Sequence, residues 1–257
     1  MRHRRLLTLA ILVAAVVMAP AVSHAQTADT RACKNQPVGL QSSKETAMPT
    51  IDYAKAELPD ANERTRRNGR GKRYDGSLRV DEPHPEAGGK GILDSWMQAV
   101  PAFPVDASDA IVIGRISDAQ AYLSPDKTGV YTEYTTLIET VLKQYAKGVI
   151  FVDGFVDVQR EGGRVRFPSG RAQSYITHYQ GVPVTGRRYV LFLKRNEDGE
   201  TFYLVTGYEV RNGCVYPLDG VNLNEGATEL AQFAAYKGAD ETSFLSDLAS
   251  ALSQSKK

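Results

Sequence analysis

One stretch of the chain, residues 188–210, limits the possible folds more than any other. Residues 189–193 form a continuous apolar run, and residues 202–205 form a second one. Between them lies a polar turn centred on Asp198 and Gly199. Two such runs, rich in aromatic and β-branched residues and separated by an Asp-Gly turn, indicate a β-hairpin. Because the first run does not alternate with polar residues, both of its faces should be buried, which requires a closed or two-layered β structure.

Further strands are expected on both sides of this hairpin. Residues 110–117, 130–142 and 150–159 have the composition of strands. A straight strand covering 130–142 would span about 40 Å, which is long for a strand, so we expect it to coil around a small barrel. Gly114 offers a position for a bulge or bend. Shorter strands are expected at 165–167, 175–179 and 214–217.

The pattern changes after Pro217, where apolar residues recur at helical spacing. This spacing predicts helices over 228–237 and 240–252, with Asp240 as the N-cap of the second. A short helix or a turn is also expected at 92–100. The chain is therefore predicted to be mainly β, with an OB-like barrel of five or six strands in residues 92–217. The helices of residues 218–257 should pack against this barrel.

The first 25 residues have the features of a secretory signal peptide. A basic start precedes an apolar stretch at 6–19, and the segment ends with Ser23-His24-Ala25. The alternative is a membrane anchor, but the stretch falls short of the roughly 20 residues that a span needs. We therefore expect cleavage after Ala25 and export to the periplasm or the extracellular space, with no transmembrane segment in the processed chain.

Residues 26–91 are rich in charges, Gly and Pro, which predicts a flexible or extended segment. The segment contains a basic run, which indicates either a polyanion-binding or processing site or simply a solvated linker. The basic residues of the run are Arg64, Arg66, Arg67, Arg70, Lys72, Arg73 and Arg79.

The two cysteines, Cys33 and Cys214, both lie in the processed chain. An exported protein meets an oxidising compartment, so these two residues are candidates for a disulfide. Such a bridge would tie the N-terminal segment to the end of the β region.

Three apolar blocks, at 109–115, 139–143 and 186–193, occur in an order that resembles netrin-like modules. That group includes the tissue inhibitors of metalloproteinases, and uncharacterised exported bacterial proteins carry similar blocks. The resemblance covers about 109–217 and implies a barrel that serves as a binding module. It does not imply protease inhibition, because the inhibitors use a cysteine at the mature N-terminus, where this chain would have Gln26.

The sequence offers little for catalysis. The processed chain has two histidines, His84 and His178, and neither belongs to a metal-binding pair. Nucleophile-elbow, phosphate-loop and dinucleotide motifs are absent, so we expect no cofactor or metal. Cleavage of the signal would leave 28 basic and 30 acidic residues. A net charge so close to zero gives no support for a nucleic-acid or anionic-membrane partner.

One group of residues is a candidate binding surface, because aromatic rings and arginines on a β face can together bind a polyanionic polymer. Its members are Arg164, Arg166, Phe167, Arg171, Tyr175 and Tyr179. The alternative is a solvent-exposed β surface with charges at its edges. We expect a non-enzymatic module that binds a protein or an envelope polymer. The second hypothesis is a cell-envelope hydrolase whose site the sequence does not reveal.

Overall fold

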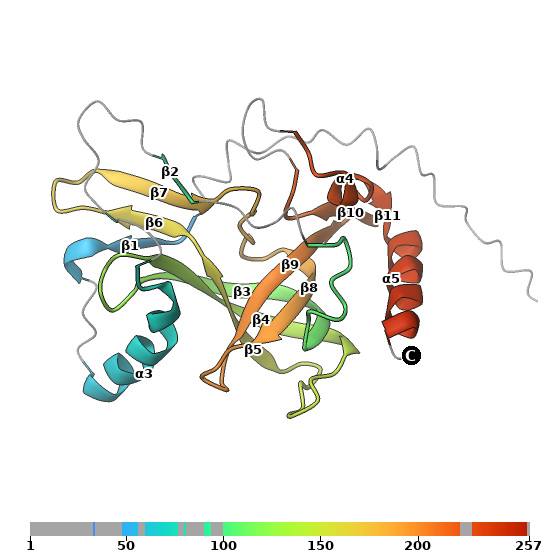
Figure 1. The fold of residues 1–257 in the computed structure, drawn as a ribbon, viewed down its shortest axis with the longest axis horizontal. Coiled ribbons are helices and arrows are strands. Elements are labelled where there is room, and N and C mark those ends of the chain that lie inside the picture. Colours follow the sequence, from blue (N-terminus) through green and yellow to red (C-terminus); the bar gives the residue numbers. More distant parts are fainter. Residues whose placement is uncertain are drawn as a thin grey trace, which may run out of the picture.

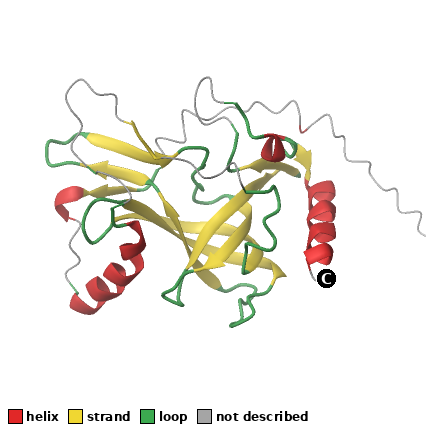
Figure 2. Ribbon diagram, viewed as in Figure 1, coloured by secondary structure: helices red, strands yellow, loops and turns green. Residues whose placement is uncertain are grey.

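The computed structural model describes residues 33, 48–55, 60–76, 80, 90–93, 100–221 and 228–255, and these form a mainly β fold (Figures 1 and 2). The first elements in chain order are β1 (Thr50–Asp52), η1 (Tyr53–Lys55), α3 (Ala61–Gly71), η2 (Lys72–Tyr74), β2 (Lys90–Leu93), β3 (Ala110–Leu123), β4 (Val130–Lys143) and β5 (Phe155–Glu161). The remaining elements are β6 (Gly163–Arg166), β7 (Ala172–Thr177), β8 (Arg188–Arg195), β9 (Phe202–Arg211), β10 (Cys214–Pro217), α4 (Ala231–Ala234), β11 (Ala239–Asp240) and α5 (Glu241–Ser255).

The strands of the described residues belong to two sheets. The smaller has the order β1-β6-β7-β2, and the larger has the order β11-β10-β9-β5-β4-β3-β8. In the larger sheet β8 also pairs with β9. Each of five strands therefore pairs with two of the other four, and these strands are β3, β4, β5, β9 and β8. The β5–β9 pairing is parallel and the other pairings among these five strands are antiparallel.

Alternate residues of β8 enter two different hydrophobic clusters. Tyr189, Leu191 and Leu193 belong to an inner cluster, to which all five of these strands contribute. Val190 and Phe192 belong to an outer cluster. Both faces of the strand are therefore buried, as its continuous apolar run predicts.

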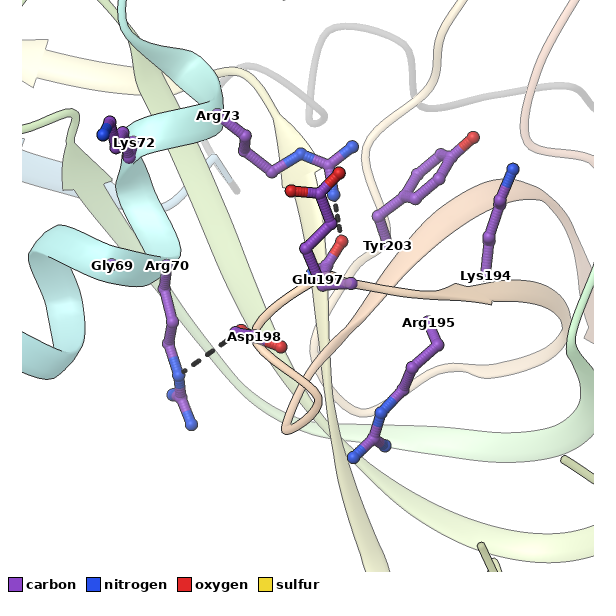
Figure 3. A pocket seen from close by; sticks show the side chains of 10 residues that line it. Gly69, Arg70, Lys72, Arg73, Lys194, Arg195, Glu197, Asp198 and Tyr203 are labelled. Atoms are coloured by element: carbon purple, nitrogen blue, oxygen red, sulfur yellow. Dashed lines mark hydrogen bonds and ion pairs between the residues drawn. The ribbon is translucent and has the colours of Figure 1, made fainter. Parts of the chain in front are cut away.

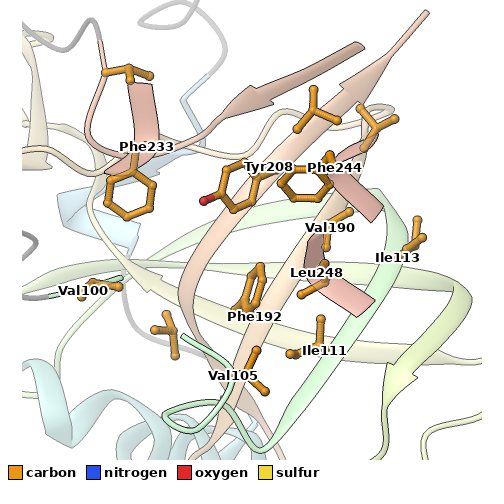
Figure 4. Close-up of a cluster of buried hydrophobic side chains, with 14 residues drawn as sticks. Val100, Val105, Ile111, Ile113, Val190, Phe192, Tyr208, Phe233, Phe244 and Leu248 are labelled. Atoms are coloured by element: carbon orange, nitrogen blue, oxygen red, sulfur yellow. The ribbon is translucent and has the colours of Figure 1, made fainter. Parts of the chain in front are cut away.

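The outer cluster is covered by the C-terminal helices, as expected. Phe233 of α4 and Phe244 and Leu248 of α5 pack near Tyr208 and Phe192 (Figure 4). The Ser243 amide donates to the Asp240 side chain at 2.9 Å, which confirms the predicted N-cap.

The long strands β3 and β4 are paired with register shifts. One shift lies between Ile113 and Gly114, where the sequence predicts a bulge or bend. A Cβ at Gly114 would lie 2.7 Å from the Leu137 carbonyl oxygen, so the strands approach closely at this point. Strand β3 continues to Leu123, further than predicted, and β5 begins only at Phe155.

Two predictions before residue 100 differ from the structure. Residues 92–93 belong to strand β2 rather than to the expected helix or turn, and residues 94–99 of that prediction lie outside the described ones. The segment expected to be flexible or extended contains α3, whose N-cap Asp60 accepts from the Glu63 amide at 2.7 Å. Helix α3 contacts the sheet through arginines, so it lacks the apolar periodicity by which helices are recognised in a sequence. The signal segment 1–25 and His84 lie outside the described residues.

The predicted disulfide is present. Cys33 and Cys214 are bonded with a Cα–Cα distance of 5.6 Å across a sequence separation of 181. The bridge attaches the N-terminal part of the chain to β10. Among the helices that the structure describes, none has the length and apolar character required to cross a bilayer.

Candidate anion-binding site

Two of the three aromatic members of the predicted binding surface are buried. Phe167 and Tyr175 are 5% and 1% exposed and pack in a small cluster with Val165. Tyr179 packs against the outer cluster, beside His178 at 4.1 Å between ring centroids. The burial of Phe167 and Tyr175 does not favour an aromatic ligand face, and ligand binding by this surface stays a prediction.

The arginines of the predicted surface lie elsewhere. Arg166 is exposed and pairs with Asp52 at 3.5 Å, and Arg171 is exposed in the turn after β6. Arg164 is half-buried on β6. Because side chains of a strand alternate between its faces, Arg164 and Arg166 point away from the side that Val165 and Phe167 occupy. Ligand binding by these arginines stays a prediction.

A different basic site forms where the segment 60–76 crosses the larger sheet. Tyr74 stacks on Tyr131 of β4, with ring centroids 4.5 Å apart. Arg67 lies 3.9 Å over the ring of Tyr122 and pairs with Glu133. Helix α3 and η2 are thereby fixed against β3 and β4, on the left of the view in Figure 1.

A buried polar network holds the turn of the β8–β9 hairpin. Gln159 of β5 is fully buried and donates to Glu133 at 2.8 Å. Its amide oxygen accepts from Asn196 at 3.1 Å, and Asn196 also donates to Thr201 at 2.7 Å. These bonds connect the hairpin turn to the centre of the sheet, so the turn has a defined position relative to η2.

Arg70 joins α3 to the same turn. Its guanidinium donates to the Glu200 carboxylate at 2.8 Å. Its nitrogens also lie 3.6 Å from a Glu133 carboxylate oxygen and 3.9 Å from one of Asp198. Burial works to lower the pKa of Arg70, but the hydrogen bond to Glu200 and the charge of Glu133 place its pKa above the ordinary value. The charge of Arg70 is thus balanced by carboxylates, which suits a structural role.

Between η2 and the hairpin lies a pocket of about 690 Å³ (Figure 3). Its lining residues are Gly69, Arg70, Lys72, Arg73, Lys194, Arg195, Asn196, Glu197, Asp198 and Tyr203. This lining holds five cations and two carboxylates, a formal excess of three positive charges. Apart from Arg70, none of the lining cations has an ion-pair partner among the described residues.

Arg73 is the central cation of the pocket. Its side chain extends from η2 toward Tyr203 (Figure 3), with the guanidinium 4.7 Å from the ring centroid, and it donates to Asn196. Arg73 and Tyr203 also line a second pocket of about 320 Å³. The two pockets share this pair of side chains, and the first of them, between η2 and the hairpin, is called the groove below.

Arg195 forms the opposite rim of the pocket. Its guanidinium lies 4.7 Å from the ring of Phe202 and 5.3 Å from that of Tyr145. Its Nε is buried and has no hydrogen-bond partner in the structure.

The chemistry of the groove is that of anion recognition. Guanidinium and ammonium groups bind phosphate, sulfate or carboxylate oxygens through charge-assisted hydrogen bonds. Within the described ranges no group of three or more His, Cys, Asp or Glu residues could hold a metal. His178 lines neither of the two pockets.

Sequence reasoning missed this site because its two halves are far apart in the chain. Lys72 and Arg73 belong to the basic run, whereas Lys194 and Arg195 end the first strand of the hairpin. Each pair of cations was visible in the sequence, but only the contact of η2 with the hairpin brings them to one pocket.

No protein-family model, curated protein or solved structure matches this chain.

Proposed function

We propose that this protein is an exported, non-enzymatic binding module that takes an anionic ligand into the groove between η2 and the β8–β9 hairpin. The observation that carries the proposal is the unpaired charge of the pocket. Lys72, Arg73, Lys194 and Arg195 all contribute to the lining, and none of them has an ion-pair partner among the described residues. Bringing like charges together is unfavourable unless an anion compensates them.

The strand pairings support a second part of the proposal, that β3, β4, β5, β8 and β9 form an OB-type barrel of the netrin-like kind. Each of the five pairs with two others, and one hydrophobic cluster draws on all of them. OB barrels bind ligands on the face of their second and third strands and on the adjacent loops. The corresponding parts here are β4, β5, residues 124–129 and residues 196–201.

The groove fits this placement. The loop 196–201 supplies Asn196, Glu197 and Asp198 to its lining, and η2 lies against Tyr131 of β4. The segment 60–76 thus covers part of the face that such barrels use, and the ligand would bind between this segment and the hairpin. A polymer with repeated phosphate or sulfate groups suits a groove with several separate cations.

The experiment is a titration of a labelled short polyphosphate into the protein at several salt concentrations. We expect Arg73→Ala with Lys194→Ala to weaken binding at least about tenfold. The slope of log K against log salt concentration should become shallower by about two, because two phosphate-binding cations are lost. The matched control is Arg164→Ala with Arg166→Ala, which removes two arginines outside the pocket and should change the affinity less than about twofold. Circular dichroism would verify that both variants fold.

The two double variants distinguish the two surfaces. If the control variant lost binding and the pocket variant kept it, the ligand would bind at the predicted 164–179 surface and the proposed groove would be wrong. If the parent protein bound no polyphosphate at any salt concentration, the anion-binding function itself would be rejected.

A further inference from the structure

Residues 147–155, which lead from β4 into β5 and are called the apolar loop below, expose a group of large apolar side chains. Val149, Phe151, Val152 and Phe155 are 64%, 69%, 53% and 63% exposed. They are the exposed large apolar residues of the part of the chain that the structure describes. Because they follow one another so closely, they form a patch, and patches of this kind mark interaction sites.

The apolar loop is held in shape while these side chains face the solvent. Ile150 is buried in the inner cluster, and the Gln144 side chain accepts from its amide at 2.9 Å and donates to its carbonyl oxygen at 3.1 Å. The Gly154 amide donates to the Phe151 carbonyl oxygen at 3.2 Å, which closes a tight turn. The Ile138 amide donates to the Gly154 carbonyl oxygen at 2.9 Å. Since the loop is already ordered, a partner that covers the patch loses little affinity to ordering it.

The apolar area of the patch matches that of a protein interface. Its four side chains together expose about 400–500 Å². A standard interface buries about 800 Å² per partner, of which a little over half, about 450 Å², is apolar. The loop projects at the lower edge of Figure 1, where another molecule can reach it. The patch is therefore large enough to form the apolar centre of one half of a protein–protein interface.

The beginning of β5, next to the patch, has an open edge. Residues 155–157 pair with Leu137, Thr136 and Thr135 of β4 on one side. On the other side β5 pairs with β9 only at Val158 and Gln159. Within the described ranges, residues 155–157 thus have a strand neighbour on one side only. An open strand edge beside an apolar patch favours a protein as the partner, because backbone groups of another chain can bond to it.

The charges of the apolar loop indicate which protein fits it. Lys147 and Asp153 flank residues 149–152 in the sequence, and both are exposed. Neither has an ion-pair partner among the described residues. By contrast, three carboxylates of β5 and the hairpin turn already lie beside Arg70.

A second copy of the chain supplies the charges that the loop lacks. In a dimer with two-fold symmetry, a contact from one residue to a second is repeated from the second to the first. Lys147 of one copy can therefore face Asp153 of the other, and the same pair forms again on the opposite side of the axis. The loop is complementary to itself in both its apolar centre and its charges.

We propose that the apolar loop is the interface of a two-fold symmetric homodimer. Phe151, Val152 and Phe155 of the two copies pack together at its centre, and two pairs of Lys147 with Asp153 lie at its rim. The inference does not depend on the proposed anion binding, because no residue of the apolar loop lines the groove.

The experiment is sedimentation equilibrium of residues 26–257, which retain every described residue, over a range of protein concentrations. We expect a reversible equilibrium between monomer and dimer. Phe151→Ser with Phe155→Ser should weaken dimerisation at least about tenfold, because it removes the apolar centre. The control is Arg164→Ala with Arg166→Ala, which changes two residues of the smaller sheet and should leave the dimer dissociation constant unchanged.

Charge reversal tests the two-fold arrangement. Lys147→Glu alone and Asp153→Lys alone should each weaken dimerisation at least about fivefold, because each places like charges opposite one another. An equimolar mixture of these two variants should dimerise about as tightly as the parent, because both pairs in the mixed dimer again join opposite charges. Circular dichroism would verify that each variant folds.

Three results would overturn the inference. They are a monomer at every concentration, a dimer that the serine variant does not weaken, and a mixture of the two charge variants that dimerises no better than either alone. If the parent stayed monomeric and its apolar loop crosslinked to a different envelope protein, that protein would replace the second copy as the partner.

Discussion

Arg160 and Asp219 form a fully enclosed ion pair in the middle of the protein. Their side chains are 3% and 0% exposed, and their closest atoms are 2.7 Å apart. Arg160 also donates to the Gly181 carbonyl oxygen, and Asp219 accepts from the Gly181 amide and from Thr206. The pair thus connects β5 to the segments on both sides of the hairpin.

We predict that Asp219→Ala reduces the free energy of unfolding by about 3–5 kcal/mol, because it leaves the Arg160 charge buried without a partner. Urea denaturation measures the change. Arg166→Ala is the control, since its pair with Asp52 is exposed and should contribute less than about 1 kcal/mol. Equal effects of the two substitutions would show that the buried pair has no special role.

Asp198 makes stability depend on pH. Burial works to raise its pKa, but the Thr201 hydroxyl and the amides of Thr201 and Glu200 outweigh burial, so the pKa lies below the ordinary value. A carboxyl group with a lowered folded-state pKa stabilises the protein above its unfolded-state pKa of about 3.9, and this contribution disappears as the pH falls through the folded-state pKa.

Asp198→Asn should therefore be less stable than the parent at neutral pH, and the difference should shrink as the pH falls below about 4. Denaturation midpoints measured across this range give the comparison. A difference that stayed constant down to the lowest pH would contradict the assigned role of Asp198.

At the level of elements, the close contact between β3 and β4 at Gly114 explains how two long strands can coil. A Cβ at this position would lie 2.8 Å from the Thr136 methyl group as well as 2.7 Å from the Leu137 carbonyl oxygen. Gly114→Ala should destabilise the protein by about 1–3 kcal/mol. Gly69→Ala, in open surroundings on α3, should instead stabilise it by up to about 1 kcal/mol. The midpoint of thermal unfolding should fall for Gly114→Ala and rise for Gly69→Ala. A higher midpoint for Gly114→Ala would contradict the close contact between β3 and β4 at this position.

The elements differ in how well the sequence predicts them, for a physical reason. Strand β4 and the hairpin strands are buried by apolar side chains, and their patterns predict them within a few residues. Helix α3 is held by the ion pairs of Arg67 and Arg70, so no apolar pattern marks it. The basic pocket depends on that same helix segment, and it was missed for the same reason. The alternation of Arg164 and Arg166 with Val165 and Phe167 was visible, and it already indicates that rings and arginines lie on opposite faces.

For the whole molecule, the Cys33–Cys214 bridge is the covalent link between the N-terminal part and the sheet. By the chain-entropy model, closing a loop of 181 residues stabilises the folded state by up to about 5 kcal/mol. Cys33→Ala with Cys214→Ala should lower the urea midpoint by an amount equivalent to about 3–5 kcal/mol. A variant as stable as the parent would show that the bridge does not constrain the unfolded chain.

Binding of an anion between η2 and the β8–β9 hairpin is the main function proposed for this protein. The most direct test is a titration of polyphosphate into the ¹⁵N-labelled protein, followed by amide chemical shifts. We expect the largest shift changes at residues 69–73 and 194–203, with Tyr203 and Arg195 among them. Changes centred on residues 164–171, or no change in either region, would contradict it.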